Sequence, residues 1–564
     1  MTVRGAAKRR SAPSTSPVAS SRSLGGRLPS GTVIVSVAVV LYMVLLSTLS
    51  IVQHRGLKTQ MNDLGNADQA LWAAANGDWT MTQSNTRQGR PMSRLAIHAN
   101  LIFWPLSLGY RIWPDPEWLL VLNSAACAIA GLGLYAIARR RLGDGLGAVV
   151  APLAFFASPI VHDANLYDFH TITLATAFLV WAVWAFDAGR PRLAWGVLFG
   201  ALLCQEDIPF VGAMLGFRLW WNGSRRQGLA VAAVSLTYLA AVAALLVPAL
   251  TGEDGLMRAT GDERYGWLGS TPLEIARTLF TEPGRVLGHV LSPDRLRLPL
   301  YLGLSGGVAA MRSWPMLLLT VPHLALGTLS QISWVTAVTG TYYWILCEAV
   351  IVLACIESAA VGSARSGRSV SPKLAYLTLS SAFFSLVFSP LPHSIGASWA
   401  NYALPPERSS LGEIVARIPA DATLCVQNNL GPHLSQRPAI LAFRKQCSEA
   451  DYVLFHLRWV GGPTTGLFAR AWPSILFGQP TDSIVRALNQ LIASPEWGLV
   501  AQRDGFYLFA RNQALRVSRG PMMAEFVRDL SIFRQQLREA EQYRWKAAPL
   551  LTGRMEWKDL LRYE

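Results

Sequence analysis

The chain carries little charge for its length. Asp, Glu, Lys and Arg make up 15% of its 564 residues, whereas a soluble globular domain carries about 25%. Hydrophobic residues make up 51%, and the mean hydropathy is +0.29. This composition excludes a disordered chain or a collagen-like one, and six cysteines are too few for a disulfide-based scaffold. It predicts a membrane protein.

Several motifs of soluble enzymes are also missing. The sequence has no P-loop, no His-Glu-x-x-His and no Cys-x-x-Cys. Transport driven by ATP hydrolysis therefore has no support within this chain. We find no internal repeat, which many secondary transporters carry.

The net charge of +15 raises the question of nucleic-acid binding, but its distribution argues against that partner. Residues 1–30 hold six basic residues and no acidic one: Arg4, Lys8, Arg9, Arg10, Arg22 and Arg27. Other basic clusters lie between apolar runs, as in polytopic membrane proteins, whose Lys and Arg stay in cytoplasmic loops. Residues 1–30 are therefore predicted to be a disordered basic tail in the cytoplasm.

About eleven apolar runs predict a transmembrane helical bundle over residues 31–398. The runs are 32–52, 117–138, 145–162, 171–188, 192–205, 208–221, 228–250, 297–312, 315–330, 342–361 and 374–391. Placing the Arg-rich loops inside leaves loops 53–116 and 251–296, and the tail after 391, outside. The protein is thus expected in the plasma membrane, with its C-terminal domain extracytoplasmic.

Two segments allow alternatives. Runs 192–205 and 208–221 form either one long helix or a hairpin with Glu206-Asp207 at its outer tip; the hairpin fits the flanking charges better. Residues 95–113 are apolar but contain His98, Pro105 and Arg111. We expect an interfacial helix there, because a full span would invert every later loop.

The chain changes character near residue 399. Strand-like runs at 423–427, 439–443, 452–456, 498–502 and 506–510, with a helical run at 481–493, predict a small α/β domain over 399–514. Residues 515–564 are expected to form a helical extension. Cys425 and Cys447 lie in this domain, where an oxidising compartment permits a disulfide that the sequence cannot establish.

Ionisable residues near hydrocarbon are costly and often functional. Asp63 and Asp68 follow the first run, five residues apart, so a regular helix would not place them on one face. Gly65 between them predicts a break that lets both converge. The alternative is that one of them caps the helix that follows.

Three basic residues, Arg87, Arg90 and Arg94, precede His98 and could hold a phosphate. Binding of anionic lipid headgroups is the competing explanation.

Three further pairs lie at the predicted outer ends of spans. Asp168 and His170 could bind a metal or orient a base, or they could belong to a solvated turn. The adjacent carboxylates Glu206 and Asp207 are hard to explain as packing. Tyr342 and Tyr343 open a span and suit either a site or a membrane-interface belt.

These residues, in this order, resemble the domain of unknown function 2079 family of bacterial and archaeal membrane proteins. The motifs are Asp-Leu-Gly-x-x-Asp-Gln-Ala-Leu-Trp at 63–72, Asp-Phe-His at 168–170 and Glu-Asp at 206–207. The outer domain adds Gln-Asn-Asn-Leu-Gly-Pro-His-Leu-Ser-Gln-Arg at 427–437 and Ala-Asp-Tyr at 450–452. The match covers roughly residues 55–510. Gln205 departs from the Lys that is frequent in the family, and Tyr342-Tyr343 from an expected His-Tyr.

That family is in turn similar to the C-type glycosyltransferases, which take sugars from polyprenyl-phosphate donors. The resemblance implies a catalytic Asp or Glu in the first outer loop, a role that falls on Asp63, with Asp68, Glu206 and Asp207 as further candidates. It implies a lipid-linked donor bound near His98, Arg87, Arg90, Arg94, Asp168, His170, Tyr342 and Tyr343. The departing phosphate needs a cation, either an arginine, with Arg264 a further candidate, or a divalent metal.

Two other functions remain open from the sequence. A transporter or lipid flippase should place broken helices and ionisable residues within the bilayer. A non-catalytic scaffold would use the outer domain to bind a partner. Carboxylates at the outer ends of spans favour the enzyme.

Overall fold

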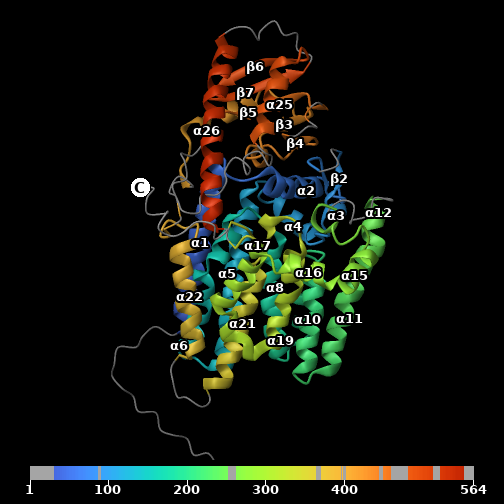
Figure 1. Cartoon of the computed structure of the whole chain (residues 1–564), viewed down its shortest axis with the longest axis vertical. Coiled ribbons are helices and arrows are strands. Elements are labelled where there is room, and N and C mark those ends of the chain that lie inside the picture. Colours follow the sequence, from blue (N-terminus) through green and yellow to red (C-terminus); the bar gives the residue numbers. More distant parts are fainter. Residues whose placement is uncertain are drawn as a thin grey trace, which may run out of the picture.

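The computed structural model describes residues 31–86, 90–251, 262–338, 340–363, 370–395, 397, 402–443, 447, 449–458, 481–511 and 521–551. The predicted tail 1–30 lies outside them. A bundle of apolar helices and a small sheet domain are joined by a layer of short elements (Figure 1). We call the end of the bundle next to this layer the domain-facing end.

The helices of the bundle coincide with the eleven apolar runs. The first seven runs correspond to α1 (Gly31–Arg55), α5 (Glu117–Leu142), α6 (Leu146–Ala157) with α7 (Pro159–Leu166), α8 (Thr171–Asp187), α9 (Pro191–Leu202), α10 (Ile208–Trp221), and α11 (Arg225–Ala241) with η2 (Val242–Leu246) and α12 (Val247–Thr251). The last four correspond to α17 (Pro293–Leu302) with η3 (Gly303–Gly307) and α18 (Val308–Ala310), α19 (Trp314–Leu317) with α20 (Val321–Leu329), α21 (Ile345–Ser363), and α22 (Pro372–Phe388).

The lengths of these helices confirm only some of the eleven predicted spans. Within the described residues, three helices are individually long and apolar enough to cross a membrane: Gly31–Arg55, Glu117–Leu142 and Arg225–Leu250. The pair α6 and α7 qualifies as a fourth, bent by 50°. The bend falls at Ser158-Pro159, where Ser158 takes an extended conformation and the proline cannot continue the hydrogen-bond ladder of α6. Several of the remaining segments are short or broken.

Residues 192–221 form the hairpin. Helix α9 ends at Leu202, α10 begins at Ile208, and Glu206-Asp207 lie in the turn between them. Arg218 near the end of α10 donates to Asp187 at the end of α8. Because α9 starts directly after α8, it must run back toward the domain-facing end, which places the turn there.

A charged network holds the opposite end of the bundle together. The side chain of Arg218 is fully buried and bonds to Asp187 and to Glu357 of α21. Arg141 of α5 contacts the same two carboxylates. Four helices are thus tied by two arginines and two acids. Removing one partner would leave a buried charge uncompensated, which costs about 3–5 kcal/mol.

The layer between bundle and sheet, here the connecting layer, spans residues 57–86 and 90–113. It contains η1 (Met61–Gly65), α2 (Asn66–Ala75), β1 (Thr82–Gln83), β2 (Met92–Ser93), α3 (Arg94–Ile97) and α4 (Phe103–Tyr110). Residues 95–113 therefore form two short helices and no span. Trp104 and Leu108 of α4 are exposed apolar residues, as expected of a helix lying at a membrane interface.

The C-terminal domain is built on a five-stranded mixed sheet of order β4-β3-β5-β7-β6. Its strands coincide with the predicted runs: β3 (Leu424–Val426), β4 (Ile440–Ala442), β5 (Tyr452–His456), β6 (Trp497–Arg503) and β7 (Phe506–Arg511). Strands β4, β3 and β5 are parallel, and β7 pairs antiparallel with β5 and β6. The helices are α23 (Ser409–Val415), α25 (Thr481–Ala493) and α26 (Pro521–Leu551), which runs beside the sheet in Figure 1.

Both faces of this sheet are buried, by different parts of the chain. Alternate strand residues such as Phe455 and Phe509 pack against Phe526 of α26. The opposite face packs against α23 and also against Leu57 and Met61 of the connecting layer, both fully buried. Burying a side chain of this size contributes about 1.5–3 kcal/mol. The membrane domain therefore completes the core of the C-terminal domain.

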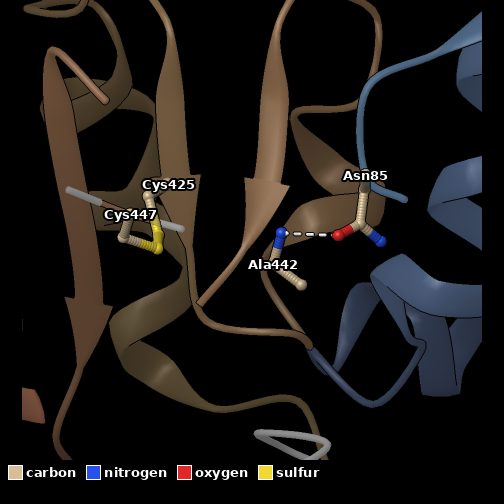
Figure 2. Close-up of a disulfide and its surroundings, with 4 residues drawn as sticks. All are labelled: Asn85, Cys425, Ala442 and Cys447. Carbon is tan, nitrogen blue, oxygen red and sulfur yellow. Dashed lines mark hydrogen bonds between the residues drawn. A yellow bond between two sulfur atoms is a disulfide. The ribbon is translucent and has the colours of Figure 1, made fainter. Parts of the chain in front are cut away.

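The disulfide that the sequence left open is present. Cys425 of β3 is bonded to Cys447, which follows β4, with Cα atoms 5.6 Å apart (Figure 2). It closes a loop across 22 residues and lies in the core on the α26 face.

Replacing Cys425 and Cys447 together by serine should lower the free energy of unfolding of the C-terminal domain by about 3 kcal/mol, from the loop-closure entropy of such a loop. The check is thermal denaturation of the purified protein with and without reductant. Reductant should shift the wild-type transition toward that of the double variant and leave the variant unchanged. An equal effect of reductant on both would contradict this role.

Candidate functional site

The candidate site begins at η1, which is hydrogen-bonded to the C-terminal domain. We call this contact the clamp. The Met61 amide donates to the Asn428 carbonyl oxygen over 2.7 Å, and the Asn62 amide donates to Oδ1 of Asn428 over 3.2 Å. A Cβ on Gly431 would come within 2.4 Å of the Met61 side chain, so only glycine allows this approach. Asp63, two residues after Met61, is thereby held at a defined place.

A second contact extends the clamp to the edge of the sheet. The Ala442 amide of β4 donates to Oδ1 of Asn85 over 3.0 Å (Figure 2). The Asn85 Nδ2 group donates to the side chains of Asn62 and Asn66. Strand β4 is an edge strand, and Asn85 supplies a partner that water would otherwise provide. The connecting layer and the sheet thus share one polar network.

Asp63 pairs with His170 across the domain-facing end of the bundle. His170 Nε2 lies 3.2 Å from Asp63 Oδ1. Burial lowers the pKa of His170, and Asp63 offsets this only in part, so the ring is neutral near pH 7 and donates through Nε2 to the carboxylate. Tyr342 stacks on the His170 ring, which fixes its orientation. His170 Nδ1 is buried without a hydrogen-bond partner.

Arg94 supplies a positive charge beside this pair. It donates to Oδ1 of Asn100 over 3.0 Å and to Oε1 of Gln83 over 3.3 Å, so these two bonds go to neutral amides. Burial lowers the pKa of Arg94, and the neighbouring charges of Glu206 and Asp63 act against that shift. Arg94 therefore lies within electrostatic range of both Glu206 and Asp63.

The adjacent carboxylates Glu206 and Asp207 have different environments. Glu206 lies 2.9 Å from His98 Nδ1 and accepts the amide of Ala99 over 3.1 Å. Burial alone would raise the pKa of Glu206, but His98 and these hydrogen bonds bring it below its ordinary value. Burial raises the pKa of Asp207, and His323, 3.2 Å away, opposes this only in part. Paired acids with opposite shifts are typical of acid–base sites.

A second arginine lies on the other side of Tyr342. The Tyr343 ring lies tilted against Tyr342, with ring centroids 4.2 Å apart, and Arg264 of α14 (Asp262–Tyr265) donates to the Tyr343 hydroxyl over 3.3 Å. The two tyrosines therefore connect His170 to Arg264, and their role in a site stays a prediction. Asp63, His170, Glu206, Asp207, Arg94 and Arg264 form a cluster of side chains at the domain-facing end. The name acidic chamber is used below for this cluster of residues.

A comparison of the whole chain with family models is consistent with this arrangement of motifs. A model described as a predicted membrane protein, DUF2079, matches residues 53–508. The chain belongs to the DUF2079 family. The matched range runs from the end of α1 to β7 and so includes both partners of the clamp. No curated protein matches the chain.

Two solved structures are similar in shape, both of ArnT from Cupriavidus metallidurans and both 12% identical in sequence. The structure bound to undecaprenyl phosphate covers 85% of this chain and 99% of that chain, with a TM-score of 0.48. The apo structure covers 86% and 98%, with a TM-score of 0.46. At these values the likeness carries no argument about the function of this DUF2079 protein.

The structure corrects the expected convergence of Asp63 and Asp68. Gly65 has helical dihedral angles, η1 continues into α2 without a break, and neither aspartate caps a helix. Asp68 is fully buried and has different partners from Asp63. It accepts hydrogen bonds from Tyr110, Ser435 and Gln436. We therefore assign Asp68 to domain docking and remove it from the proposed catalytic set.

The remaining predicted residues lie at different places in the structure. Asp168 accepts the Gln60 amide over 2.8 Å, so it positions the start of η1. The Arg90 carbonyl accepts the Thr86 hydroxyl, and the Arg90 side chain is exposed. Arg87 lies outside the described residues. Among the described residues, no three His, Cys, Asp or Glu side chains gather as metal ligands.

Sequence reasoning missed His323 and Asn100. His323 is a single ionisable residue within the apolar run 315–330, and that isolation was the available signal. Its Nδ1 is buried without a hydrogen-bond partner, as is Oδ1 of Asp207. Asn100 orients Arg94 and also donates to the Cys204 carbonyl over 2.6 Å. Nothing in the local sequence marks Asn100, because its partner lies about a hundred residues away.

Asp68 should make the stability of the docked C-terminal domain depend on pH. Burial raises the pKa of Asp68 from its ordinary value near 3.8 to about 6. Its contribution to stability is thus fully present below about pH 4 and is lost as the pH rises through 6. Asp68→Asn should remove this pH dependence from thermal unfolding. Asp68→Ala should destabilise docking at pH 7 by about 2–4 kcal/mol, because three donors lose their acceptor.

Thermal melts of the purified protein between pH 4.5 and 7.5 test both expectations. Asp144→Asn, at an exposed residue far from the interface, is the matched control. Identical pH profiles for wild type and Asp68→Asn would overturn the assignment.

Proposed function

We propose that this protein is an integral membrane glycosyltransferase that transfers a sugar from a polyprenyl-phosphate donor to an acceptor hydroxyl. The observation that carries the proposal is the Asp63–His170 pair beside Arg94, whose two hydrogen bonds go to neutral amides. A carboxylate and a cation at the end of a membrane bundle suit a donor whose lipid lies in the bilayer and whose phosphate lies at its surface. The sugar and the acceptor are not specified by these residues.

Asp63 is proposed as the general base. It takes the proton of the acceptor hydroxyl while the hydroxyl oxygen forms a bond to the anomeric carbon. The bond from the anomeric carbon to the phosphate oxygen breaks, and its electron pair leaves with the lipid phosphate. The His170 Nε2 hydrogen holds one carboxylate oxygen, so the other is directed to the acceptor. Tyr342 prevents the imidazole from turning away.

Arg94 is proposed to stabilise the departing phosphate. An arginine that donates to neutral amides keeps its charge available for an anion, whereas one paired with a carboxylate does not. Arg264, which contacts the Tyr343 ring and hydroxyl, is the second candidate. The sequence alone could not choose between them.

The proposed orientation follows from charge. Basic residues gather at the bundle end away from the sheet, at the end of α5 and the starts of α9 and α11: Arg139, Arg140, Arg141, Arg190, Arg192, Arg225 and Arg226. The positive-inside rule assigns that end to the cytoplasm. The acidic chamber and the C-terminal domain would then face the extracytoplasmic side of the plasma membrane.

Asp63→Asn should lower sugar transfer at least about 100-fold, because a general base contributes about 10²–10⁴ to the rate. The assay uses the full chain in vesicles with radiolabelled polyprenyl-phosphate-linked hexoses and pentoses and a membrane extract as acceptor. It measures both label transfer and the release of polyprenyl phosphate. Asp144→Asn is the control and should retain the wild-type rate. A wild-type rate in a folded Asp63→Asn protein would refute the proposed base.

Arg94→Gln should reduce the same transfer about 100-fold, the usual effect of removing one group that stabilises the developing charge. Arg111→Gln changes an exposed arginine of the same layer and should have little effect. If Arg94→Gln is active and Arg264→Gln is not, the phosphate role belongs to Arg264. Loss of transfer in Arg111→Gln to the same extent would indicate a general effect of surface charge.

A further inference from the structure

A buried carboxylate inside the bundle has no role in the acidic chamber. Glu348 lies in the first turn of α21 and is fully buried. Neither of its carboxylate oxygens has a hydrogen-bond partner of normal geometry. An ionised carboxylate in a bilayer costs several kcal/mol. The favourable field of a helix N-terminus contributes about 0.3–1 kcal/mol, so it does not offset this cost.

Hydroxyl groups from two other segments face Glu348. Ser158, at the bend between α6 and α7, and Ser305 of η3 are its polar neighbours. Tyr301 of α17 lies within electrostatic range. The hydroxyls of Ser158 and Tyr301 are buried and, like the carboxylate, have no hydrogen-bond partner. Ser158 and Ser305 interact with the carboxylate, but its oxygens have no hydrogen bond of normal geometry, so the cluster is incompletely satisfied.

Both neighbouring segments are broken helices. Helices α6 and α7 bend by 50° at Ser158, and η3 contains a non-helical residue at Gly306. A break in a helix releases main-chain carbonyl oxygens from the ladder. Here the carbonyls of Ser305 and Gly306 accept hydrogen bonds from the side chains of Ser380 and Cys355. Gly306 packs so closely that a Cβ would come within 2.9 Å of Ile351 and 2.8 Å of Leu377. The break is therefore held against α21 and α22.

The charge of the cluster determines what the occupant would be. Asp163 of α7 is the other nearby acid, and its Oδ2 already accepts the amide of Gly340 over 2.8 Å. Glu348 with the hydroxyl groups of Ser158 and Tyr301 carries one negative charge. A divalent ion such as Ca²⁺ is bound through several carboxylates. One carboxylate with hydroxyl oxygens matches a single positive charge.

We propose that Glu348, Ser158 and Tyr301 form a binding site for a small monovalent cation of the size of sodium, inside the membrane bundle. The cation would balance the carboxylate and satisfy the three unpartnered groups together. Because Ser158 and Glu348 belong to different helices, the bound ion would hold the bent pair α6 and α7 against α21. The site is separate from the acidic chamber, and the proposal does not depend on the glycosyltransferase assignment.

The test is thermal unfolding of the purified full chain in detergent, with sodium chloride replaced by choline chloride at constant ionic strength. Sodium should raise the unfolding temperature by about 3 °C at saturation, because a ligand bound only to the folded state stabilises it. Glu348→Gln should abolish this dependence. Glu274→Gln, at an exposed carboxylate, is the matched control and should keep it.

Two milder variants allow the proposal to be tested if Glu348→Gln does not fold. Ser158→Ala and Tyr301→Phe keep the charge but each remove one oxygen ligand, and each should raise the sodium concentration at the midpoint at least about 10-fold. Equal unfolding temperatures in sodium and choline for the wild type would overturn the proposal. An unfolding temperature that depends on pH but not on sodium would also overturn it, because Glu348 would then be a protonated acid.

Discussion

The structure depends on one contact, the clamp of η1 by the C-terminal domain. Leu57 and Met61 complete one face of the sheet domain's core, while Asn428 holds the main chain of Met61 and Asn62. Neither part can be removed without exposing apolar surface of the other. Since Asp63 directly follows these anchored residues, the packing of a domain more than 350 residues away in sequence sets the position of the candidate base.

Buried charge is costly unless an opposite charge lies beside it, and the two ends of the bundle supply different partners. At the end away from the sheet, Arg218 is surrounded by Asp187 and Glu357 and forms a closed structural network. At the domain-facing end the acids meet histidines instead. Asp63 pairs with His170 and Asp207 with His323. The same principle makes Glu348, which has no such partner, the exception in the bundle.

Much of the fold followed from local patterns. The five strand runs, the hairpin at 192–221 and the short helices at 95–113 are all present, because each reflects hydropathy and charge within a few residues. The prediction that Asp63 and Asp68 converge was wrong. It assumed that Gly65 breaks the helix, whereas Gly65 is needed for close approach: a Cβ there would come within 2.5 Å of Met61 and 3.4 Å of Pro432. His323 and Glu348 went unnoticed since each lies inside an apolar run, away from the outer ends of spans where the candidate residues were sought.

By itself, the sequence determined that the protein is a membrane bundle with an α/β domain, and it named Asp63, Glu206 and Asp207 as acids at one end. Those conclusions rest on periodicity, run length and motif order, which are properties of neighbouring residues. Only the tertiary structure decided which partner each acid receives: His170 for Asp63, His98 for Glu206, His323 for Asp207 and a hydroxyl cluster for Asp68. The reason is physical. The chemistry of a carboxylate depends on burial and on groups within a few ångströms, and here those groups come from helices far apart along the chain.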